Sequence, residues 1–312
     1  MEVHFLGTGA GVPARHRNVS ALALRFLNEA GDVWLFDCGE ATQHQFLRSP
    51  LSLASISTIF ISHLHGDHLL GLPGLLSSRS FQGGETPVTI YGPKGLKEFI
   101  HQSLETTKTK LRYELVIDEL KEGFLFENEW YEVDTLSLIH PVESFAFRIK
   151  EKERPGALHV EKLKALGIAP GPIYAQLKQG KRVTLDDGQT IDGRDFVDAP
   201  LPGRTVVIAG DTAPVEKMDS FAANADLLVH EATFASDQQG NAHAYGHSTI
   251  ADACGIAKRA NVKKVVLTHV SSRYSRNEDV YLHEVEKQFP GAIVAYDLFV
   301  LKLAKTRGAQ ND

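Results

Sequence analysis

The sequence predicts an α/β protein built as a four-layer αββα sandwich, in which two sheets pack face to face and helices cover both outer faces. Two observations predict this fold. Both halves of the 312-residue chain contain short apolar runs typical of strands, and helical patterns separate the later ones. Several of these strands are also followed directly by histidine or aspartate, which indicates an active site at one edge of the sandwich.

The expected strands of the first half are short apolar runs, most of them followed closely by turn residues. They cover 3–6, 21–26, 33–36, 56–61, 88–91, 111–116, 131–139 and 145–149. Helical periodicity predicts a helix over 95–104. The second half repeats this construction, with strands expected at 205–209, 227–230, 265–268 and 293–295 and helices at about 248–259 and 279–289.

Residues 151–200 interrupt the pattern with several prolines and glycines, so we expect one catalytic domain, 1–312, with an insertion here. The stretch from 162 to 182 contains no acidic residue and five basic ones, namely Lys162, Lys164, Lys178, Lys181 and Arg182. Taken alone, such a run is more often a solvated surface than a binding site. Its excess positive charge nevertheless stands out in a chain of net charge −6.

Composition narrows the class of protein. The hydrophobic content is 43%, and no apolar run approaches the ~20 residues that cross a bilayer, so we expect no membrane association. The first residues resemble a strand rather than a signal peptide, which predicts a cytoplasmic location. With only Cys38 and Cys254, neither a disulfide framework nor a multi-thiolate zinc site is available.

The segment directly after the strand expected at 56–61 predicts a metal site. Within six positions it contains His63, His65, Asp67 and His68. Residues two apart in a turning segment project to the same side, so one pair can bind one cation while the other pair faces a second. The alternatives are a histidine-rich surface loop or hydrogen-bonded core histidines, but four such groups at this spacing favour metal binding.

Three further candidate ligands follow apolar strands elsewhere in the chain: His140, Asp211 and His269. We assign His63, His65 and His140 to one ion and Asp67, His68 and His269 to the other, with Asp211 between them. Two cations about 3.5 to 4 Å apart lower the pKa of a shared water and stabilise charge on a phosphoryl or acyl oxygen. This ligand set predicts metal-assisted hydrolysis.

Two other features have more than one interpretation. The run from Gly7 to Gly11 is rich in glycine like a nucleotide-binding turn, but it lacks the last glycine of that motif and no helical pattern follows it. Asp37 either supports the metal loop through a hydrogen bond or serves as a turn residue.

The pattern His-x-His-x-Asp-His at residues 63–68 resembles the signature of the metallo-β-lactamase fold. Further segments are similar to the ribonuclease Z family: Phe5-Leu6-Gly7-Thr8-Gly9, Phe36-Asp37-Cys38-Gly39-Glu40, residues 71–76 and 79–84, Gly210-Asp211-Thr212, His230-Glu231-Ala232-Thr233-Phe234 and His247-Ser248-Thr249. The resemblance covers nearly the whole chain.

This resemblance implies a zinc-dependent endoribonuclease that removes the 3′ trailer of precursor tRNA. The cut would fall after the discriminator nucleotide and leave a 3′ hydroxyl on the tRNA and a 5′ phosphate on the trailer. It implies two Zn²⁺ per subunit, with Mn²⁺ as the alternative ion, and a homodimer in which a protruding flexible arm, approximately 151–200, presents tRNA to the other subunit's site.

The resemblance also implies roles for individual residues. Asp67 would act as general base, while His247, paired with Glu231, would protonate the leaving 3′ oxygen. The alternative for His247 is a role at the start of a helix, which Ser248 or Thr249 would fill as well.

Substrate contacts are implied at two places. Residues 13–18 resemble a tRNA-contacting loop of pattern Pro-x-Lys-x-Arg-Asn, with Arg15 in place of the lysine. In it, Arg15, Arg17 and Asn18 would contact the tRNA, and the basic side chains of the arm would contact phosphates. Two rival interpretations remain: another hydrolase of the same fold, and a tRNA-binding protein without turnover.

Overall fold

The computed structural model describes residues 1–27, 31–185, 188–276 and 278–304. The chain divides into two compact units. The larger unit contains Met1–Glu127, Glu132–Ile149 and Thr205–Leu303, and the smaller unit contains Asn128–Tyr131 and Lys150–Arg204. No helix among the described residues is long and apolar enough to span a membrane.

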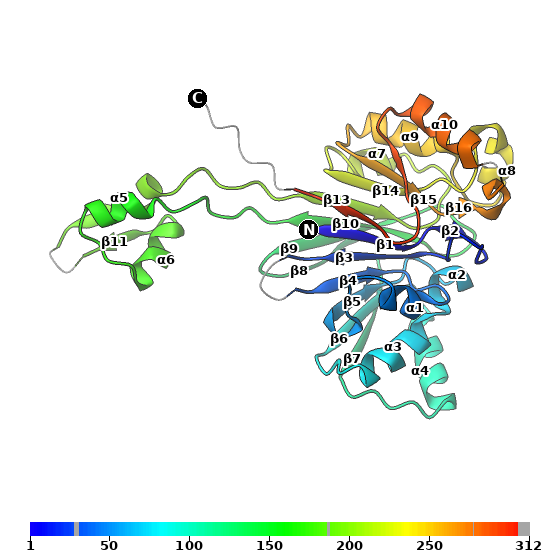
Figure 1. The fold of residues 1–312 in the computed structure, drawn as a ribbon, viewed down its shortest axis with the longest axis horizontal. Helices are drawn as coiled ribbons and strands as arrows, with labels where there is room; N and C mark the ends of the chain where they lie inside the picture. Colours follow the sequence, from blue (N-terminus) through cyan, green and yellow to red (C-terminus); the bar gives the residue numbers. More distant parts are fainter. Residues whose placement is uncertain (28–30, 186–187, 277, 305–312) are drawn as a thin grey trace. The chain divides into compact units, whose positions relative to one another are not determined.

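Two seven-stranded sheets form the body of the structure (Figure 1). The first has the order β18 (Phe299–Lys302), β1 (Glu2–Gly7), β3 (Ala21–Arg25), β4 (Val33–Phe36), β5 (Ile56–Phe60), β6 (Val88–Gly92) and β7 (Leu115–Glu119). The second has the order β17 (Ile293–Val294), β15 (Val265–Thr268), β14 (Leu227–Glu231), β13 (Thr205–Ala209), β10 (Phe145–Glu151), β9 (Tyr131–Ser137) and β8 (Gly123–Glu127). A short parallel pair joins β2 (Gly9–Ala10) to β16 (Val270–Ser271).

Helices cover the outer faces of both sheets (Figure 1). On the first sheet lie α1 (Thr42–Leu47), α2 (Gly66–Leu69), α3 (Leu72–Phe81) and α4 (Leu96–Thr106). On the second lie α7 (Lys217–Phe221), α8 (Gln239–Ala244), α9 (Ile250–Arg259) and α10 (Glu278–Gln288). The predicted αββα sandwich is therefore confirmed.

Aromatic side chains fill the space between the sheets. Phe36 of β4 and Phe60 of β5 stack with ring centroids 4.7 Å apart, and Phe147 of β10 contacts Phe60 from the opposite sheet at 5.1 Å. Each outer face has an apolar core of its own with its helices. Because large aromatic rings bury much area and fix their relative orientation, this layer holds the two sheets in register.

The direction of the strands places their carboxyl ends, which precede the candidate ligands, at one edge of each sheet. β4, β5, β6 and β7 are parallel neighbours, as are β13, β14, β15 and β17. The carboxyl ends of parallel strands meet at the same edge of a sheet, where loops carry binding groups. The loops after β5, β13 and β15 carry most of the candidate ligands.

The strand predicted over 111–116 is wrong in position, because β7 begins at Leu115. The preceding residues are tied to α3 instead: the Tyr113 hydroxyl donates to the carbonyl oxygen of Leu76, and the Arg112 N–H donates to Ser80 Oγ. The strand itself contains Asp118 and Glu119, which are exposed at the edge of the sheet. Charge is typical of edge strands, so the apolar run Leu115-Val116-Ile117 marks only the first part of this strand.

The smaller unit has an apolar core of its own. It contains α5 (Val160–Ala165), α6 (Pro172–Lys178), the antiparallel pair β11 (Arg182–Thr184) and β12 (Thr190–Asp192), and a 3₁₀ turn at Gly193–Phe196. Leu163, Ile168, Leu177 and Ile191 form the buried core of this unit.

Candidate metal centre

The larger unit brings together all seven side chains that the sequence analysis selected as ligands. His63 and His65 follow β5, and α2 carries Asp67 and His68. The other three are His140 after β9, Asp211 after β13 and His269 after β15.

The first of the two groups contains His63, His65 and His140, whose candidate ligand atoms lie within 4.8 Å of one another. His65 Nδ1 and His140 Nε2 are 3.1 Å apart. The other ring nitrogen of His140, Nδ1, lies 2.8 Å from the carbonyl oxygen of Gly246 and therefore donates to it. This contact leaves the Nε2 lone pair of His140 directed at the group.

The second group contains Asp67, His68 and His269. Asp67 Oδ2 lies 3.3 Å from His269 Nε2 and 3.5 Å from His68 Nε2, and the two Nε2 atoms are 3.3 Å apart. Asp67 Oδ2 also accepts a hydrogen bond of 2.7 Å from the N–H of Gly11. The backbone loop at the start of the chain thus helps to fix the carboxylate.

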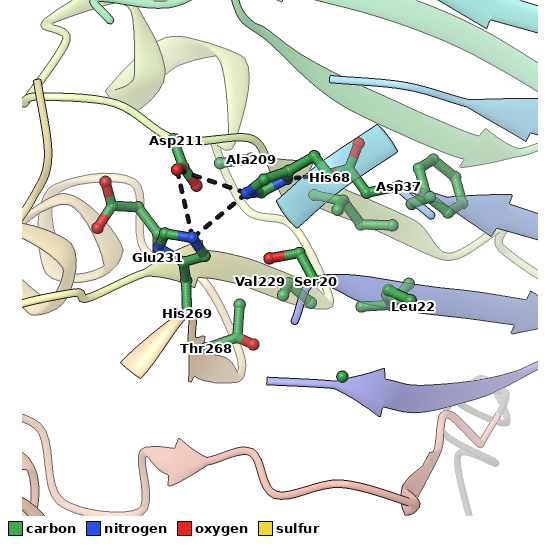
Figure 2. Close-up of a pocket in the computed structure, with 14 residues that line it drawn as sticks. Ser20, Leu22, Asp37, His68, Ala209, Asp211, Val229, Glu231, Thr268 and His269 are labelled. Carbon is green, nitrogen blue, oxygen red and sulfur yellow. Dashed lines mark hydrogen bonds and ion pairs between the residues drawn. The ribbon is translucent and has the colours of Figure 1, made fainter. Parts of the chain in front are cut away.

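Asp211 lies between the two groups. Its Oδ2 is 3.7 Å from His63 Nε2, 3.5 Å from His68 Nε2 and 3.3 Å from His269 Nε2. Figure 2 shows the Asp211 carboxylate facing the rings of His68 and His269 from above, with dashed lines joining the three. One carboxylate thus faces members of both groups, as a bridging ligand would.

These distances fit a cation better than they fit direct hydrogen bonds. Ligands about 2.0 Å from a tetrahedral ion lie roughly 3.3 Å from one another. His63 Nε2 is buried and has no hydrogen-bond partner among the described residues, although a buried polar atom of this kind normally has one. Imidazole and carboxylate are ligands that zinc and manganese both accept. The residues present therefore fit a divalent metal centre.

The pKa shifts of the residues in the centre also fit a bound cation. Burial alone would raise the pKa of Asp211, but the charges of His269 and His68 hold it well below its ordinary value. Burial would lower the pKa of His68, whereas Asp211 and Asp37 hold it well above the ordinary value. The carboxylates thus make the pocket attractive to positive charge, which favours a bound cation.

Asp37 supports the metal loop from behind. Its carboxylate accepts hydrogen bonds from Ser62 N–H at 2.7 Å, from the Ser62 hydroxyl at 2.8 Å and from His68 Nδ1 at 2.7 Å. Asp37 has φ 57°, in the left-handed region. Both interpretations from the sequence therefore apply, since Asp37 is a turn residue whose side chain orients a ligand.

His247 and Glu231 form a pair beside the centre. His247 Nδ1 lies 2.9 Å from Glu231 Oε1, and the same carboxylate accepts hydrogen bonds from the N–H groups of Thr212 and Ser248 at 3.1 Å. Burial alone would lower the pKa of His247, but the hydrogen bond and charge of Glu231 hold it above its ordinary value. The helix-start role falls to Thr249, whose side chain caps α9 in a capping box with Asp252.

The residues proposed to contact substrate near the N-terminus lie around a surface pocket of about 450 Å³, which Arg48 also lines. Arg15 is exposed there, whereas Arg17 is buried. The Arg17 guanidinium donates to Thr8 Oγ1 at 2.7 Å and to Glu278, and the Asn18 side chain donates to the carbonyl oxygen of Glu40 at 2.8 Å. The structure thus uses Arg17 and Asn18 to hold the loop and leaves Arg15 at its surface.

The five basic residues predicted in the insertion are all exposed on the smaller unit. Lys164 forms an ion pair with Glu161 at 2.9 Å, and Arg182 forms one with Asp192 at 3.0 Å.

Three residues that hold the ligands were not found from the sequence: Ser62, Thr233 and Gly246. Ser62 and Thr233 contact ligand histidines through their hydroxyls, and Gly246 does so through its carbonyl. Thr233 and Gly246 lie far along the chain from their histidines. The only sequence signal was their place beside or within the motifs that carry His63, Glu231 and His247.

The fold and this His/Asp centre define a metal-dependent hydrolase of the metallo-β-lactamase fold. A protein described as having that fold, YhfI from Bacillus subtilis, matches with TM-score 0.66 at 22% identity, covering 96% of this chain and 98% of that one. A family model described as anti-Pycsar protein Apyc1 matches residues 1–152.

Two further relatives specify the family. A ribonuclease Z from Shouchella clausii (strain KSM-K16) is 64% identical over 312 residues, which is all of both chains. The crystal structure of human tRNase Z, short form, matches with TM-score 0.71 at 31% identity and covers 97% of this chain and 100% of that one. The chain belongs to the ribonuclease Z family. The predicted class of enzyme, a metal-dependent endoribonuclease, is thereby confirmed.

Proposed function

We propose that this chain removes the 3′ trailer of precursor tRNA in a zinc-dependent cleavage. The cut falls after the discriminator nucleotide and leaves a 3′ hydroxyl on the tRNA and a 5′ phosphate on the trailer. The observation that supports this most strongly is the full-length identity of 64% to a ribonuclease Z, combined with a complete ligand set and the His247–Glu231 pair beside it.

We assign two Zn²⁺ ions per subunit, with Mn²⁺ as the alternative ion. His63, His65 and His140 would hold one ion, Asp67, His68 and His269 would hold the other, and Asp211, which faces members of both groups, would be the shared ligand. When bound, such ions lower the pKa of the attacking water and stabilise negative charge on the phosphoryl oxygens.

Asp67 is the proposed general base. Burial alone would raise its pKa, but the contact with His269 and the charge of His68 hold it well below the ordinary value, so it is ionised at neutral pH. The hydrogen bond from Gly11 N–H to Oδ2 fixes the carboxylate where it can accept the proton of the attacking water.

His247 is the proposed general acid. Its Nδ1–H donates to Glu231, so Nε2 is the atom that delivers a proton to the leaving 3′ oxygen. Glu231 raises the pKa of His247 above its ordinary value, which favours the imidazolium form that can donate a proton. The buried hydrogen bonds to Glu231 fix the orientation of the imidazole.

Substrate affinity is assigned to two basic surfaces. One is the pocket at Arg15, and the other is the arm with Lys162, Lys164, Lys178, Lys181 and Arg182. Exposed side chains of this kind contact phosphates and recognise the shape of the RNA rather than its sequence. The proposal includes a homodimer, in which one subunit's arm presents tRNA to the other subunit's site. The proposed location is the cytoplasm, where newly made tRNA is the substrate.

The test is cleavage of a precursor tRNA that carries a 3′ trailer, with both product ends mapped. The unchanged chain, loaded with zinc, is expected to make a single cut beside the discriminator nucleotide. The cut should be lost after chelation and in Asp67→Ala, whereas Asp118→Ala, at an exposed carboxylate of β7, should cleave normally. Intact RNA alongside hydrolysis of a simple phosphodiester or thioester would replace the proposal with another hydrolase of this fold.

A further inference from the structure

Two buried carboxylates behind the metal centre have the same pattern of hydrogen bonds. Asp37 and Glu231 each hold one histidine by a direct hydrogen bond and reach a second histidine through a hydroxyl group. The direct partners are His68 for Asp37 and His247 for Glu231. The hydroxyl groups belong to Ser62 and Thr233.

On the Asp37 side, Ser62 Oγ lies 2.8 Å from Asp37 Oδ2 and 3.0 Å from His63 Nδ1. On the Glu231 side, Thr233 Oγ1 lies 2.7 Å from Glu231 Oε2 and 2.8 Å from His269 Nδ1. All six residues are buried. Each hydroxyl therefore stands between a carboxylate and the outer nitrogen of a ligand histidine.

The direction of these hydrogen bonds follows from the number of protons available. A carboxylate only accepts, so each hydroxyl gives its single proton to the carboxylate. The hydroxyl oxygen then accepts from the imidazole, which requires the ring proton to be on Nδ1. The lone pair of the histidine is left on Nε2, the atom that faces Asp211 in both His63 and His269.

We propose that Ser62 and Thr233 are positioning residues of the metal centre. Each fixes the tautomer and the ring plane of its histidine, Ser62 for His63 and Thr233 for His269, so that Nε2 is aimed at the ion before the ion arrives. This inference rests on the metal centre assigned above and adds two residues that contact neither metal nor RNA. The hydroxyls raise metal affinity by removing the competing Nε2–H tautomer and the rotated ring positions.

The two hydroxyls act at different ligand groups, because His63 belongs to the first group and His269 to the second. Thr233 also connects the metal centre to the acid, since Glu231 is the partner of His247 as well. Loss of the Thr233 hydroxyl is therefore expected to disturb His269 and His247, which lie on different loops, whereas the histidines linked to Ser62, His63 and His68, both belong to the metal loop.

The first experiment measures zinc affinity of the metal-stripped full chain by competition with a chromophoric chelator. Thr233→Val keeps the shape of the side chain but removes the hydroxyl, and Ser62→Ala removes the other. Each is expected to weaken zinc binding about 10- to 100-fold. Thr233→Ser restores the hydroxyl and is expected to stay within about threefold of the unchanged chain.

The matched control is Ser80→Ala in α3, which removes a buried hydroxyl that accepts from Arg112 N–H and has no hydrogen bond to a histidine of the described residues. It should lower stability without changing zinc affinity. Unchanged affinity in Thr233→Val and Ser62→Ala, measured on folded protein, would overturn the inference. If the unchanged chain bound no zinc, both the assigned metal centre and this inference would be wrong.

A second measurement needs no variant. In the zinc-loaded chain, ¹⁵N-detected histidine spectra are expected to show His63 and His269 with the proton on Nδ1 and the metal on Nε2. Metal on Nδ1 of either residue would refute the inference even if a variant failed to fold.

Discussion

At the scale of single residues, the geometry around His247 bears on whether this side chain holds metal or donates a proton. His247 belongs to one candidate ligand cluster with Asp211 and His269, yet its Nδ1 is already occupied by Glu231 at 2.9 Å. The distance from His247 Nδ1 to Asp211 Oδ2 is longer, 3.8 Å. The geometry therefore favours the role of proton donor for His247 over that of ligand.

This assignment predicts the behaviour of His247→Ala. Removal of the proton donor should lower kcat for precursor tRNA cleavage by about 10²- to 10⁴-fold, while zinc content, measured by atomic absorption, should stay at the level of the unchanged chain. The control is His243→Ala, at a histidine that pairs with Asp252 away from the centre. Loss of zinc together with activity would identify His247 as a ligand instead.

A second residue-scale prediction concerns acid stability. His4 is buried on β1, with Nε2 3.3 Å from Glu2 Oε2; Arg25 and Lys302 of the neighbouring strands also face that carboxylate. Burial lowers the pKa of His4, an effect that Glu2 only partly offsets. The unfolded chain therefore takes up a proton at a higher pH than the folded one, and stability present above about pH 6.5 falls as the pH decreases.

His4→Leu removes this titration. Its free energy of unfolding, measured by urea denaturation of metal-free protein at pH 7.5, 6.5 and 5.5, should fall less between pH 6.5 and 5.5 than that of the unchanged chain. The limiting difference in slope is about 1.4 kcal/mol per pH unit. Parallel pH profiles for the two proteins would show that His4 titrates alike in the folded and unfolded states.

Much of the candidate site could be predicted from sequence at this scale, because ligand histidines and aspartates directly follow apolar strands. The residues that hold these ligands in place could not be predicted from the sequence. Thr233 contacts a histidine 36 positions away and Gly246 one 106 positions away, and neither separation leaves a local pattern. Arg17 differs, since the resemblance implied an RNA contact while its guanidinium donates to Thr8 within the fold; the RNA contact stays a prediction.

At the scale of elements, two loops approach each other closely behind the metal loop. Cys38 N–H donates to the carbonyl oxygen of His68 at 2.8 Å, and Gly71 N–H donates to that of Cys38 at 2.9 Å. A Cβ at Gly71 would lie 2.0 Å from the carbonyl oxygen of Gly39. Glycine is therefore required at Gly71 for close backbone contact rather than for a special φ angle.

Gly71→Ala is accordingly expected to force the two loops apart. The clash with backbone should cost about 1 to 3 kcal/mol of unfolding free energy and weaken zinc binding, because the displaced loop carries Asp67 and His68. Thermal and urea unfolding, together with a zinc titration, test both effects. Gly240→Ala in α8 is the control: beyond its chain neighbours and its own helix backbone, the added Cβ meets no described atom within 4 Å, so stability should not fall.

The elements themselves were predictable where apolar runs are bounded by turns, and β4, β13 and β15 have the expected bounds. Helix α3 was missed because its apolar stripe is short: Gly74 lies within it, and the buried face continues from the leucines into the polar residues Arg79 and Ser80. Strand β18 was missed although its sequence, Phe299-Val300-Leu301-Lys302, is strand-like; its partner β1 lies almost 300 residues earlier, so no hairpin turn indicates the pairing.

At the scale of the whole molecule, the metal ligands and the basic insertion belong to different compact units. The larger unit carries all the candidate catalytic groups. The smaller unit carries basic residues but none of the candidate ligand clusters found among the described residues. Under the proposed function, the larger unit supplies the chemistry and the smaller unit supplies affinity.

This division predicts that charge can be removed from the smaller unit without loss of catalysis. Lys178 and Lys181 are the most informative positions to substitute, because both are exposed and neither forms an ion pair with another described residue. The double variant Lys178→Ala/Lys181→Ala should raise KM for precursor tRNA and leave kcat at saturation nearly unchanged. Each lost phosphate contact should also reduce the slope of log affinity against log salt by roughly 0.7 to 0.9.

The matched control is Lys97→Ala/Lys258→Ala, which removes the same charge from exposed positions on α4 and α9 of the larger unit. A general effect of net charge would change KM and the salt slope equally in both double variants, whereas phosphate contacts by the insertion would change them only in the first. A fall in kcat with unchanged KM in Lys178→Ala/Lys181→Ala would contradict the division, because it would assign these side chains to the chemical step.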